Sequence, residues 1–355
     1  MNGCLRTDLA LVGFGNVARR FARLLEDCRE LLMREYALDY RIVGVATRRH
    51  GGRYDPRGVD VADCNGQDSI TGRRASPALD IIERLGQSDA DFRVVVETTT
   101  LDIAAGEPAI DHVRAAVAAG CHVITANKGP VAFAYAALRD EAEAGGVSFL
   151  FEGAVMDGIP IFNLVRETLP AVTLRGFRGV VNSTTNHILT ALERGEPFDA
   201  ALERMQSEGI AEADASLDID GWDAAAKAAA LANVLLDARI SPHAVRRTGI
   251  QKSDGARARQ ALADGKRLKL VASAVRERNG GVSATVEPVE LPSSDILAGL
   301  NGKANALVLQ TDLLGDLAIC QLEGNLTHTA YALLSDLVTI RRRRAQPAAP
   351  ARRIL

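Results

Sequence analysis

The chain has 355 residues, and its 42 lysines and arginines against 45 acidic residues give a formal net charge of −3 at neutral pH. With 47% hydrophobic and 25% charged residues it has the composition of a globular protein, which excludes a disordered or fibrous chain. The nearly balanced charge gives no reason to expect nucleic-acid binding, and the sequence has no apolar run of about 18 residues that could cross a membrane.

The cysteines and the two ends of the chain indicate where the protein resides. Five cysteines are scattered without a CxxC pair, which argues against a disulfide framework or a structural zinc site and favours a reducing compartment. The apolar stretch near the N-terminus is too short for a signal peptide, so we expect a cytoplasmic protein. Arginines and two prolines predict a solvated, disordered basic tail over residues 341–355.

The first part of the chain alternates strand-like and helix-like segments. Short apolar runs predict strands at Asp8–Val12, Arg41–Ala46, Phe92–Val96 and His122–Thr125. Helical patterns follow at Asn16–Glu30, Pro108–Ala119 and Phe133–Ala144. This order predicts an α/β fold with a doubly wound, mostly parallel sheet and right-handed crossovers.

The second part of the chain has strands that alternate less regularly with helices. Strands are expected at Val147–Phe151, Thr173–Val181, Val282–Leu291 and Ala306–Thr311. Helices are expected at Ile161–Leu169, Ile188–Arg194, Asp199–Ser207, Gly221–Ala238 and Thr327–Ile340. These elements predict a mixed α+β region.

A glycine-rich turn follows the first predicted strand. Residues 13–18 read GFGNVA, which fits the pattern G-x-G-x-x-G/A between a strand and a helix. Gly13 permits a tight turn, Gly15 allows the backbone to approach a pyrophosphate, and Ala18 permits close helix–strand packing. The segment therefore predicts a dinucleotide site, with a glycine-rich turn of another α/β protein as the alternative.

The residues after the second predicted strand bear on the choice of nucleotide. An NAD enzyme usually has an acidic residue there to accept from the ribose 2′-hydroxyl. This chain has Arg48 and Arg49 instead, which suit a 2′-phosphate and favour NADP. A solvated loop that allows use of both cofactors is the alternative.

Two lysines lie in segments whose residue types suit a catalytic or substrate-binding role. Lys128, in the sequence TANKGP, follows a predicted strand and could orient an anionic substrate or assist proton transfer, unless it is a surface lysine before a turn.

Five acidic residues precede Lys227 within residues 212–227, and Asp223 lies four residues before it on the same helix face. Because alanines flank Lys227, we expect a partly desolvated lysine suited to general acid or base catalysis. An ordinary ion pair beside a solvated loop is the alternative.

In this order the motifs resemble the homoserine dehydrogenase family of NAD(P)-dependent oxidoreductases. The resemblance runs from Leu9 to about Ile340, and its most specific parts are TANKGP and the acidic block at residues 209–227. Further matching segments are EGAVMDGIPIF (152–162), NSTTNHIL (182–189) and LPSSDILAGLNGKANAL (291–307). The resemblance implies reversible reduction of L-aspartate 4-semialdehyde to L-homoserine with NADP or NAD.

The resemblance also implies roles for particular residues. Lys227 would donate the proton during aldehyde reduction, assisted by Asp223, with Lys128 beside the reacting carbonyl. The acids around the substrate would be Glu212, Asp214, Asp218 and Asp223. Cofactor-binding positions would be Gly13, Gly15, Asn16, Val17, Arg48, Arg49, Thr98, Lys128 and Gly324. A monovalent cation such as sodium would be bound at Glu152, Val155, Asp157 and Ile159, a segment that could otherwise be a plain irregular turn.

The implied architecture has a Rossmann-type domain at residues 1–148 and a substrate and dimerisation domain at 149–305. Residues 306–340 would return to the first domain, and the protein would be a homodimer. The chain ends soon after the last predicted helix, so the regulatory domain that many relatives carry is not expected.

Two departures from the family pattern leave other functions open. Glu323-Gly324-Asn325 stands where the family usually has a glycine-rich loop, and Ala215 replaces a proline. The first departure motivates a nucleotide-binding sensor without turnover, and a reductase of another small amino-acid aldehyde or oxo acid is a further alternative. An aldehyde dehydrogenase is disfavoured because Cys121 lies too early on its strand to serve as the nucleophile.

Overall fold

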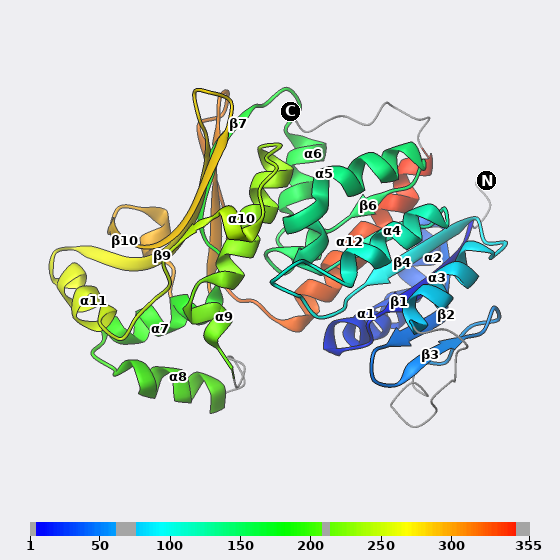
Figure 1. Ribbon diagram of the computed structural model, residues 1–355, viewed down its shortest axis with the longest axis horizontal. Coiled ribbons are helices and arrows are strands. Elements are labelled where there is room, and N and C mark those ends of the chain that lie inside the picture. Colours follow the sequence, from blue (N-terminus) through cyan, green and yellow to red (C-terminus); the bar gives the residue numbers. More distant parts are fainter. Residues whose placement is uncertain (1–4, 62–75, 208–213, 346–355) are drawn as a thin grey trace. The chain divides into compact units, whose positions relative to one another are not determined.

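The computed structural model describes residues 5–61, 76–207 and 214–345. The described residues form two compact units: unit 1 contains those up to Pro160 and those from Asn325 onward, and unit 2 contains those between Ile161 and Gly324. Figure 1 shows the elements of both units.

Unit 1 is built on a six-stranded sheet in the order β3-β2-β1-β4-β5-β6. Its strands are β1 (Leu5–Val12), β2 (Leu38–Thr47), β3 (Gly51–Tyr54), β4 (Phe92–Glu97), β5 (His122–Thr125) and β6 (Phe149–Leu150). All neighbours are parallel except the β2–β3 hairpin. The predicted parallel sheet is therefore confirmed.

Helices cover both faces of this sheet, and the alternation of side chains along β1 shows why. The helices of unit 1 are α1 (Asn16–Asp27), α2 (Arg29–Tyr36), α3 (Pro77–Gly86), α4 (Ala109–Ala118), α5 (Lys128–Ala144), the short 3₁₀ helix η2 (Glu152–Ala154) and α12 (Leu326–Ala345). Leu9 and Leu11 join a core with Phe21 of α1 and Leu333 of α12, whereas Ala10 and Gly44 face Ile81 of α3.

Unit 2 contains a second six-stranded sheet in the order β12-β11-β7-β9-β10-β8. Its strands are β7 (Leu174–Val180), β8 (Arg246–Arg247), β9 (Lys266–Arg276), β10 (Val282–Pro292), β11 (Asn305–Thr311) and β12 (Asp316–Gln321). This sheet is antiparallel except at β8–β10. The mixed α+β character expected for this region is thus observed.

The helices of unit 2 include the alanine-rich α10 (Trp222–Leu235), which packs on β9 and β10. Most of its side chains are buried, because alanine allows a helix to approach a sheet closely. The remaining helices are α6 (Ile161–Thr168), α7 (Ser183–Glu193), α8 (Phe198–Ser207), α9 (Ser216–Ile219), α11 (Asp254–Ala263) and the 3₁₀ turns η3 (Pro242–Ala244) and η4 (Ile296–Gly299).

The structure divides the chain differently from the expected boundaries at 148 and 305. Residues 149–160 belong to unit 1, and residues 305–321 form β11 and β12, which pair with β7 in the sheet of unit 2. Within the segment 306–340, the part that packs in unit 1 is α12, which lies against α1 and β5.

The last helix extends into the segment for which a basic tail was predicted. Helix α12 continues through Ala345, and Arg341 is buried and donates to the backbone carbonyl of Ala37 at 3.4 Å. The Arg342 guanidinium lies over the Tyr36 ring at 5.0 Å. These contacts order residues 341–345, which the sequence placed in a disordered tail, and residues 346–355 lie outside the described part.

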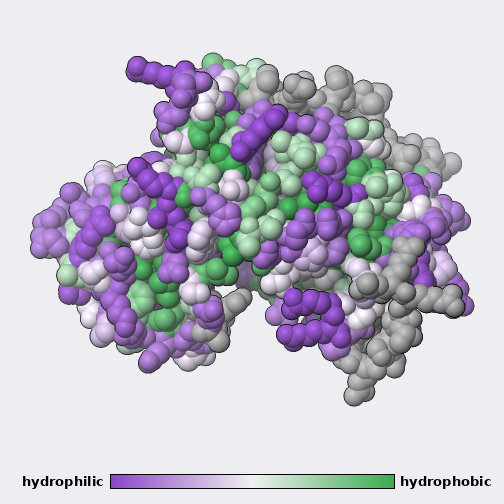
Figure 2. Space-filling view, viewed as in Figure 1, coloured by the Kyte–Doolittle hydropathy of each residue, from purple (hydrophilic) through white to green (hydrophobic). Residues whose placement is uncertain are grey.

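In the described ranges, no helix is both long enough and apolar enough to cross a membrane. On the face that Figure 2 shows, hydrophilic and hydrophobic side chains are interspersed.

Candidate active site

The glycine-rich turn joins the carboxyl end of β1 to α1, as the sequence predicts. Gly13 has a φ of +87°, and a Cβ on it would lie 2.7 Å from the backbone carbonyl of Thr98, so a side chain cannot be accommodated. Its N–H donates to the carbonyl of Ala46 at 2.9 Å, and its carbonyl accepts from the Thr98 hydroxyl at 2.9 Å. The turn is thereby fixed between the ends of β2 and β4.

The beginning of α1 fits the phosphates of a dinucleotide. Gly15 is the N-cap residue, no side chain caps the helix, and no acidic residue lies in its first turn, which includes Asn16 and Val17. A Cβ on Gly15 would meet no atom within 4 Å, so the space beside the turn is open. Free N–H groups and the positive end of the helix dipole stabilise an anion at such a position.

Arg48 and Arg49 occupy the exposed turn between β2 and β3. The Thr47 hydroxyl accepts from the His50 N–H at 2.9 Å and closes this turn. Gly13 bonds to Ala46 of β2, and Arg48 follows Ala46 by two residues, so the turn lies close to the glycine turn. No hydrogen bond or ion pair joins either arginine side chain to another residue within the described ranges. Both guanidinium groups are thus available to a phosphate.

Lys128 is the first residue of α5, at the carboxyl edge of the same sheet. It is half-buried, and the preceding Asn127 caps the helix by accepting from the Gly129 N–H at 2.9 Å. The helix therefore begins five residues before its predicted start at Phe133, because Asn127 caps it at Lys128.

A cluster of polar side chains in unit 2 contains three of the predicted site residues. The Lys227 ammonium lies 3.0 Å from the Asp223 carboxylate and donates to the Val181 carbonyl at 2.6 Å. The Asn182 amide donates to Asp218 at 2.7 Å and to Asp223 at 2.8 Å. The side chains of Lys227 and Asp223 are 14% and 17% exposed, so the predicted shielding of the lysine is present together with the predicted ion pair.

The electrostatics of this cluster raise the pKa of one carboxyl group. Burial raises the pKa of the Asp218 carboxyl, and the neighbouring Asp223 charge raises it further, against the opposing effects of Asn182 and Lys227. The Asp218 carboxyl therefore binds its proton more tightly than a free aspartate does.

Asn182 was not identified as a site residue from the sequence. It combines two functions, because its side-chain oxygen also accepts from the Thr185 N–H at 2.9 Å and caps α7. Asparagine is a common N-cap residue, so Asn182 before the sequence STTN was a signal in the sequence that α7 begins at Ser183. This start lies five residues before the predicted one at Ile188.

The turn before α10 is held in place by the segment at β8. Gly249 packs against this turn so closely that a Cβ would lie 2.7 Å from the backbone of Asp220. The Arg247 guanidinium lies 3.9 Å from the centre of the Trp222 ring and donates to the Asp220 carbonyl. These contacts hold the turn that lies between Asp218 and Asp223.

Of the other predicted acids, the described one does not bond to the cluster. Asp214 is exposed and accepts from the Ser216 N–H at 3.0 Å, and its bonds to Ser216 lower the pKa of its carboxyl. Glu212 lies outside the described residues. Ala215, where the family has proline, is the buried N-cap of α9.

The predicted cation segment folds over α12 in unit 1. Glu152 is buried, and its N–H donates to the buried Asp336 carboxylate at 2.8 Å. Asp157, at φ +50°, accepts from the Thr329 hydroxyl at 3.1 Å, and Val155 and Ile159 are buried. No group of three or more His, Cys, Asp or Glu side chains suited to a metal occurs in the described part.

The altered loop near Gly324 joins β12 to α12. Glu323 is exposed, and the Asn325 side-chain oxygen accepts from the N–H groups of Thr327 and His328 at 2.8 and 3.3 Å. Asn325 thus caps α12, which gives this departure from the family pattern a local structural reason.

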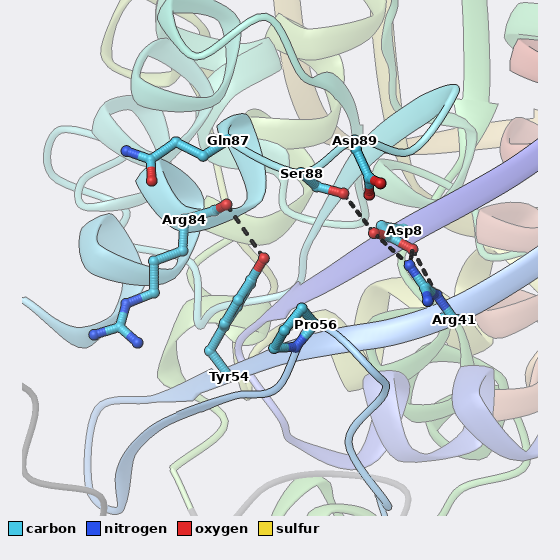
Figure 3. A pocket seen from close by; sticks show the side chains of 8 residues that line it. All are labelled: Asp8, Arg41, Tyr54, Pro56, Arg84, Gln87, Ser88 and Asp89. Atoms are coloured by element: carbon cyan, nitrogen blue, oxygen red, sulfur yellow. Dashed lines mark hydrogen bonds and ion pairs between the residues drawn. The ribbon is translucent and has the colours of Figure 1, made fainter.

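A cavity of about 630 Å³ lies elsewhere in unit 1 (Figure 3). Its wall includes Asp8, in the first half of β1, whereas the glycine turn follows the other end of that strand. The Asp8 carboxylate accepts from Arg41 at 2.8 Å and from the Ser88 hydroxyl at 2.5 Å. This cavity is therefore separate from the predicted cofactor site.

The doubly wound sheet with its glycine turn, together with the lysine–carboxylate cluster of unit 2, defines a nicotinamide-nucleotide-dependent oxidoreductase. Two family profiles match the chain: homoserine dehydrogenase over residues 160–338, and the homoserine dehydrogenase NAD-binding domain over residues 13–152. The chain belongs to the homoserine dehydrogenase family.

Similar proteins of known name and structure span nearly the whole chain. The NAD(+)-dependent homoserine dehydrogenase of Pseudomonas canavaninivorans is 35% identical over 94% of this chain and 95% of its own. The homoserine dehydrogenase of Methanocaldococcus jannaschii is 33% identical over 94% and 98%. The solved homoserine dehydrogenase from Thiobacillus denitrificans superimposes with a TM-score of 0.83 at 29% identity, covering 99% of this chain and 77% of that one.

Proposed function

We propose that this enzyme catalyses the reversible NAD(P)H-dependent reduction of L-aspartate 4-semialdehyde to L-homoserine. The observation that carries the proposal is the Lys227–Asp223 pair, shielded from solvent and tied through Asn182 to Asp218. A zwitterionic amino-acid substrate needs both carboxylates and cations in its site, and this segment supplies both.

In this mechanism Lys227 donates the proton to the developing alkoxide. Asp223, 3.0 Å away, orients the ammonium, and the Val181 carbonyl accepts a second of its protons at 2.6 Å. Asp218 and Asp223, with Glu212 and Asp214, are proposed to hold the substrate, and Lys128 is the second lysine of the reaction. The nicotinamide cofactor supplies the hydride when it is bound.

The reaction is tested by following oxidation of NADPH, and in parallel of NADH, with L-aspartate 4-semialdehyde. Turnover supports the proposal. NADPH binding without turnover on this substrate would indicate another small aldehyde or oxo acid, or a nucleotide-binding sensor. Absence of both binding and turnover would mean that the loop at Glu323 is incompatible with the cofactor.

The role of Lys227 is tested with Lys227→Ala. We expect turnover to fall by about 10²- to 10⁴-fold, the usual contribution of a positioned general acid, at nearly unchanged NADPH affinity. The matched control is Lys252→Ala, which removes an exposed lysine of unit 2 paired with Asp199. Equal losses of turnover and cofactor affinity in Lys227→Ala would contradict the role.

For the cofactor, we propose a preference for NADP with NAD also accepted. Support comes from the exposed Arg48 and Arg49 beside the glycine turn. The relative from Pseudomonas canavaninivorans is named as NAD(+)-dependent, so the preference needs a direct test. Replacing both arginines by serine should weaken NADPH binding while sparing NADH, and an equal effect on the two would refute it.

We propose that the segment from Glu152 to Ile159 binds a monovalent cation such as sodium through backbone carbonyls. Two buried carboxylates, Glu152 and Asp336, provide compensating charge at this segment. Sodium chloride should raise the melting temperature more than choline chloride does at equal ionic strength. An identical response to both salts would overturn the site.

We propose a cytoplasmic homodimer. Exposed large apolar side chains in unit 2, including Val275, Leu313 and Leu314, support self-association, and the scattered cysteines support a reducing compartment. Light scattering in solution should give twice the mass of the chain, and the mass of one chain would contradict the dimer.

A further inference from the structure

A fully buried carboxylate ends β4 in unit 1, and none of the roles proposed above uses it. Glu97 is 0% exposed and lies at the carboxyl edge of the parallel sheet, between the glycine turn and Lys128 in the strand order. Burial of a charged carboxylate is costly unless hydrogen bonds satisfy it, so its partners show what it holds in place.

Both oxygens of Glu97 accept hydrogen bonds. Oε1 accepts from the Thr99 N–H at 2.9 Å and from the Thr99 hydroxyl, and Oε2 accepts from the Thr125 hydroxyl at 2.8 Å. The Nδ1 atom of the buried His112 lies 3.8 Å from Oε1. The carboxylate thus joins the end of β4 to the end of β5 and shapes the backbone after each strand.

One arm of this network leads to Lys128. The Thr125 hydroxyl accepts from the Asn127 N–H at 2.9 Å, and Asn127 in turn caps α5 by accepting from Gly129 at 2.9 Å. The Asn127 amide donates to the Thr99 carbonyl at 3.0 Å. Lys128 therefore lies between two residues whose backbone N–H groups are fixed by this network.

The other arm leads to the cofactor turn. Thr98, the residue after Glu97, donates its N–H to the Val12 carbonyl at 2.8 Å and its hydroxyl to the Gly13 carbonyl at 2.9 Å. The bonds from Thr99 to Glu97 determine the path of the backbone at this point. A displacement of residues 97–99 would therefore move the glycine turn.

We propose that Glu97 is a positioning residue that fixes both the glycine turn of the cofactor site and Lys128. The proposal rests on the function proposed above, because it assumes that Lys128 takes part in the reaction. Its two arms have different consequences: loss of the Thr125 bond releases the Lys128 arm alone, whereas a change at Glu97 affects both arms.

The Lys128 arm is tested with a matched pair of variants. Thr125→Val keeps the shape of the side chain but removes the hydroxyl, and Thr125→Ser keeps the hydroxyl. We expect Thr125→Val to lower kcat by about 10²-fold, as misplacement of a reacting group by about 1 Å does, with a smaller loss of NADPH affinity than Glu97→Gln shows. Thr125→Ser should restore kcat.

The cofactor arm is tested with Glu97→Gln, in which one amide hydrogen faces a hydroxyl that already accepts a bond from Asn127. We expect both a lower kcat and weaker NADPH binding, by about tenfold, the factor that 1.4 kcal/mol gives. The control is Glu193→Gln, which alters a buried carboxylate paired with Arg267 in unit 2 and should lower stability without this pattern.

Several outcomes would overturn the positioning role. Equal kcat values for Thr125→Val and Thr125→Ser, or wild-type kcat and NADPH affinity in Glu97→Gln, would do so. If Glu97→Gln does not fold, the Thr125 pair decides alone. If the wild type binds NADPH but does not reduce L-aspartate 4-semialdehyde, the proposed function fails, and NADPH binding by Glu97→Gln still tests the cofactor arm.

Discussion

The buried lysine of β9 allows a quantitative prediction of how stability depends on pH. Lys269 is 0% exposed, and its ammonium donates to the Asn186 side-chain oxygen at 3.0 Å and to the Leu300 carbonyl. Burial lowers the pKa of this lysine from 10.5 to about 8; the charge of Glu193 opposes that shift, and the charge of Arg267 adds to it.

The sign of the effect follows from proton binding. Between pH 8 and 10.5 the unfolded chain retains the lysine proton that the folded chain has released. Stability therefore rises with pH through this window, by about 1.4 kcal/mol per unit and by about 3 kcal/mol in all. Below pH 8 both states are protonated, and the cost of burying the charge is constant.

The test compares wild type with Lys269→Met by urea unfolding across this pH range. Trp222, the only tryptophan, reports on unit 2, which contains Lys269. Because Lys269→Met loses the bonds to Asn186 and Leu300, its free energy of unfolding also differs from that of wild type by about 1–3 kcal/mol, and this contribution does not vary with pH. Lys252→Met, at an exposed position, controls for the loss of one charge. A constant difference between wild type and Lys269→Met from pH 8 to 10.5 would refute the reasoning.

Three further predictions concern the site and the cysteines. Gly249→Ala should lower the urea midpoint of unit 2, because its Cβ collides with the turn before α10. Gly299→Ala, whose Cβ meets no atom within 4 Å, should leave the midpoint unchanged, and similar midpoints for the two variants would contradict this. Asn182→Asp should lower kcat by about 10²-fold at unchanged NADPH affinity, because it replaces the donor between two carboxylates with a third negative charge. Full activity of this variant would show that Asn182 does not position these acids. Burial raises the pKa of the Cys121 thiol to about 11, so iodoacetamide should label the exposed Cys320 and spare Cys121 in the native protein, as mass spectrometry can determine.

Local patterns in the sequence were sufficient for most of the elements that carry the cofactor site. The strands at residues 8–12, 92–96 and 122–125 and the glycine turn were recognised because apolar runs and glycine positions reflect local geometry. Helix α3 and strands β9 and β12 were not predicted. In β12 the exposed and half-buried residues alternate, and this strand forms only because β11 offers it an antiparallel partner.

The candidate site was predicted unevenly for the same reason. Asp223 and Lys227 could be paired because four residues on a helix bring side chains together. Asn182 lies 41 residues from Asp223 in the chain, so no periodic pattern links the two. Glu97 lies one residue beyond the predicted strand Phe92–Val96, and no local pattern links it to Thr125, 28 residues further along.

The sequence by itself determined the family, the dinucleotide turn and the lysine–carboxylate pair, because each depends on residue types at short, fixed spacing. Only the tertiary structure decided where the units divide, that α12 completes unit 1, and that Asn182 and Glu97 hold the neighbouring groups in place. Those features depend on strand pairing and on hydrogen bonds between residues distant in the chain, and folding alone brings such residues within bonding distance.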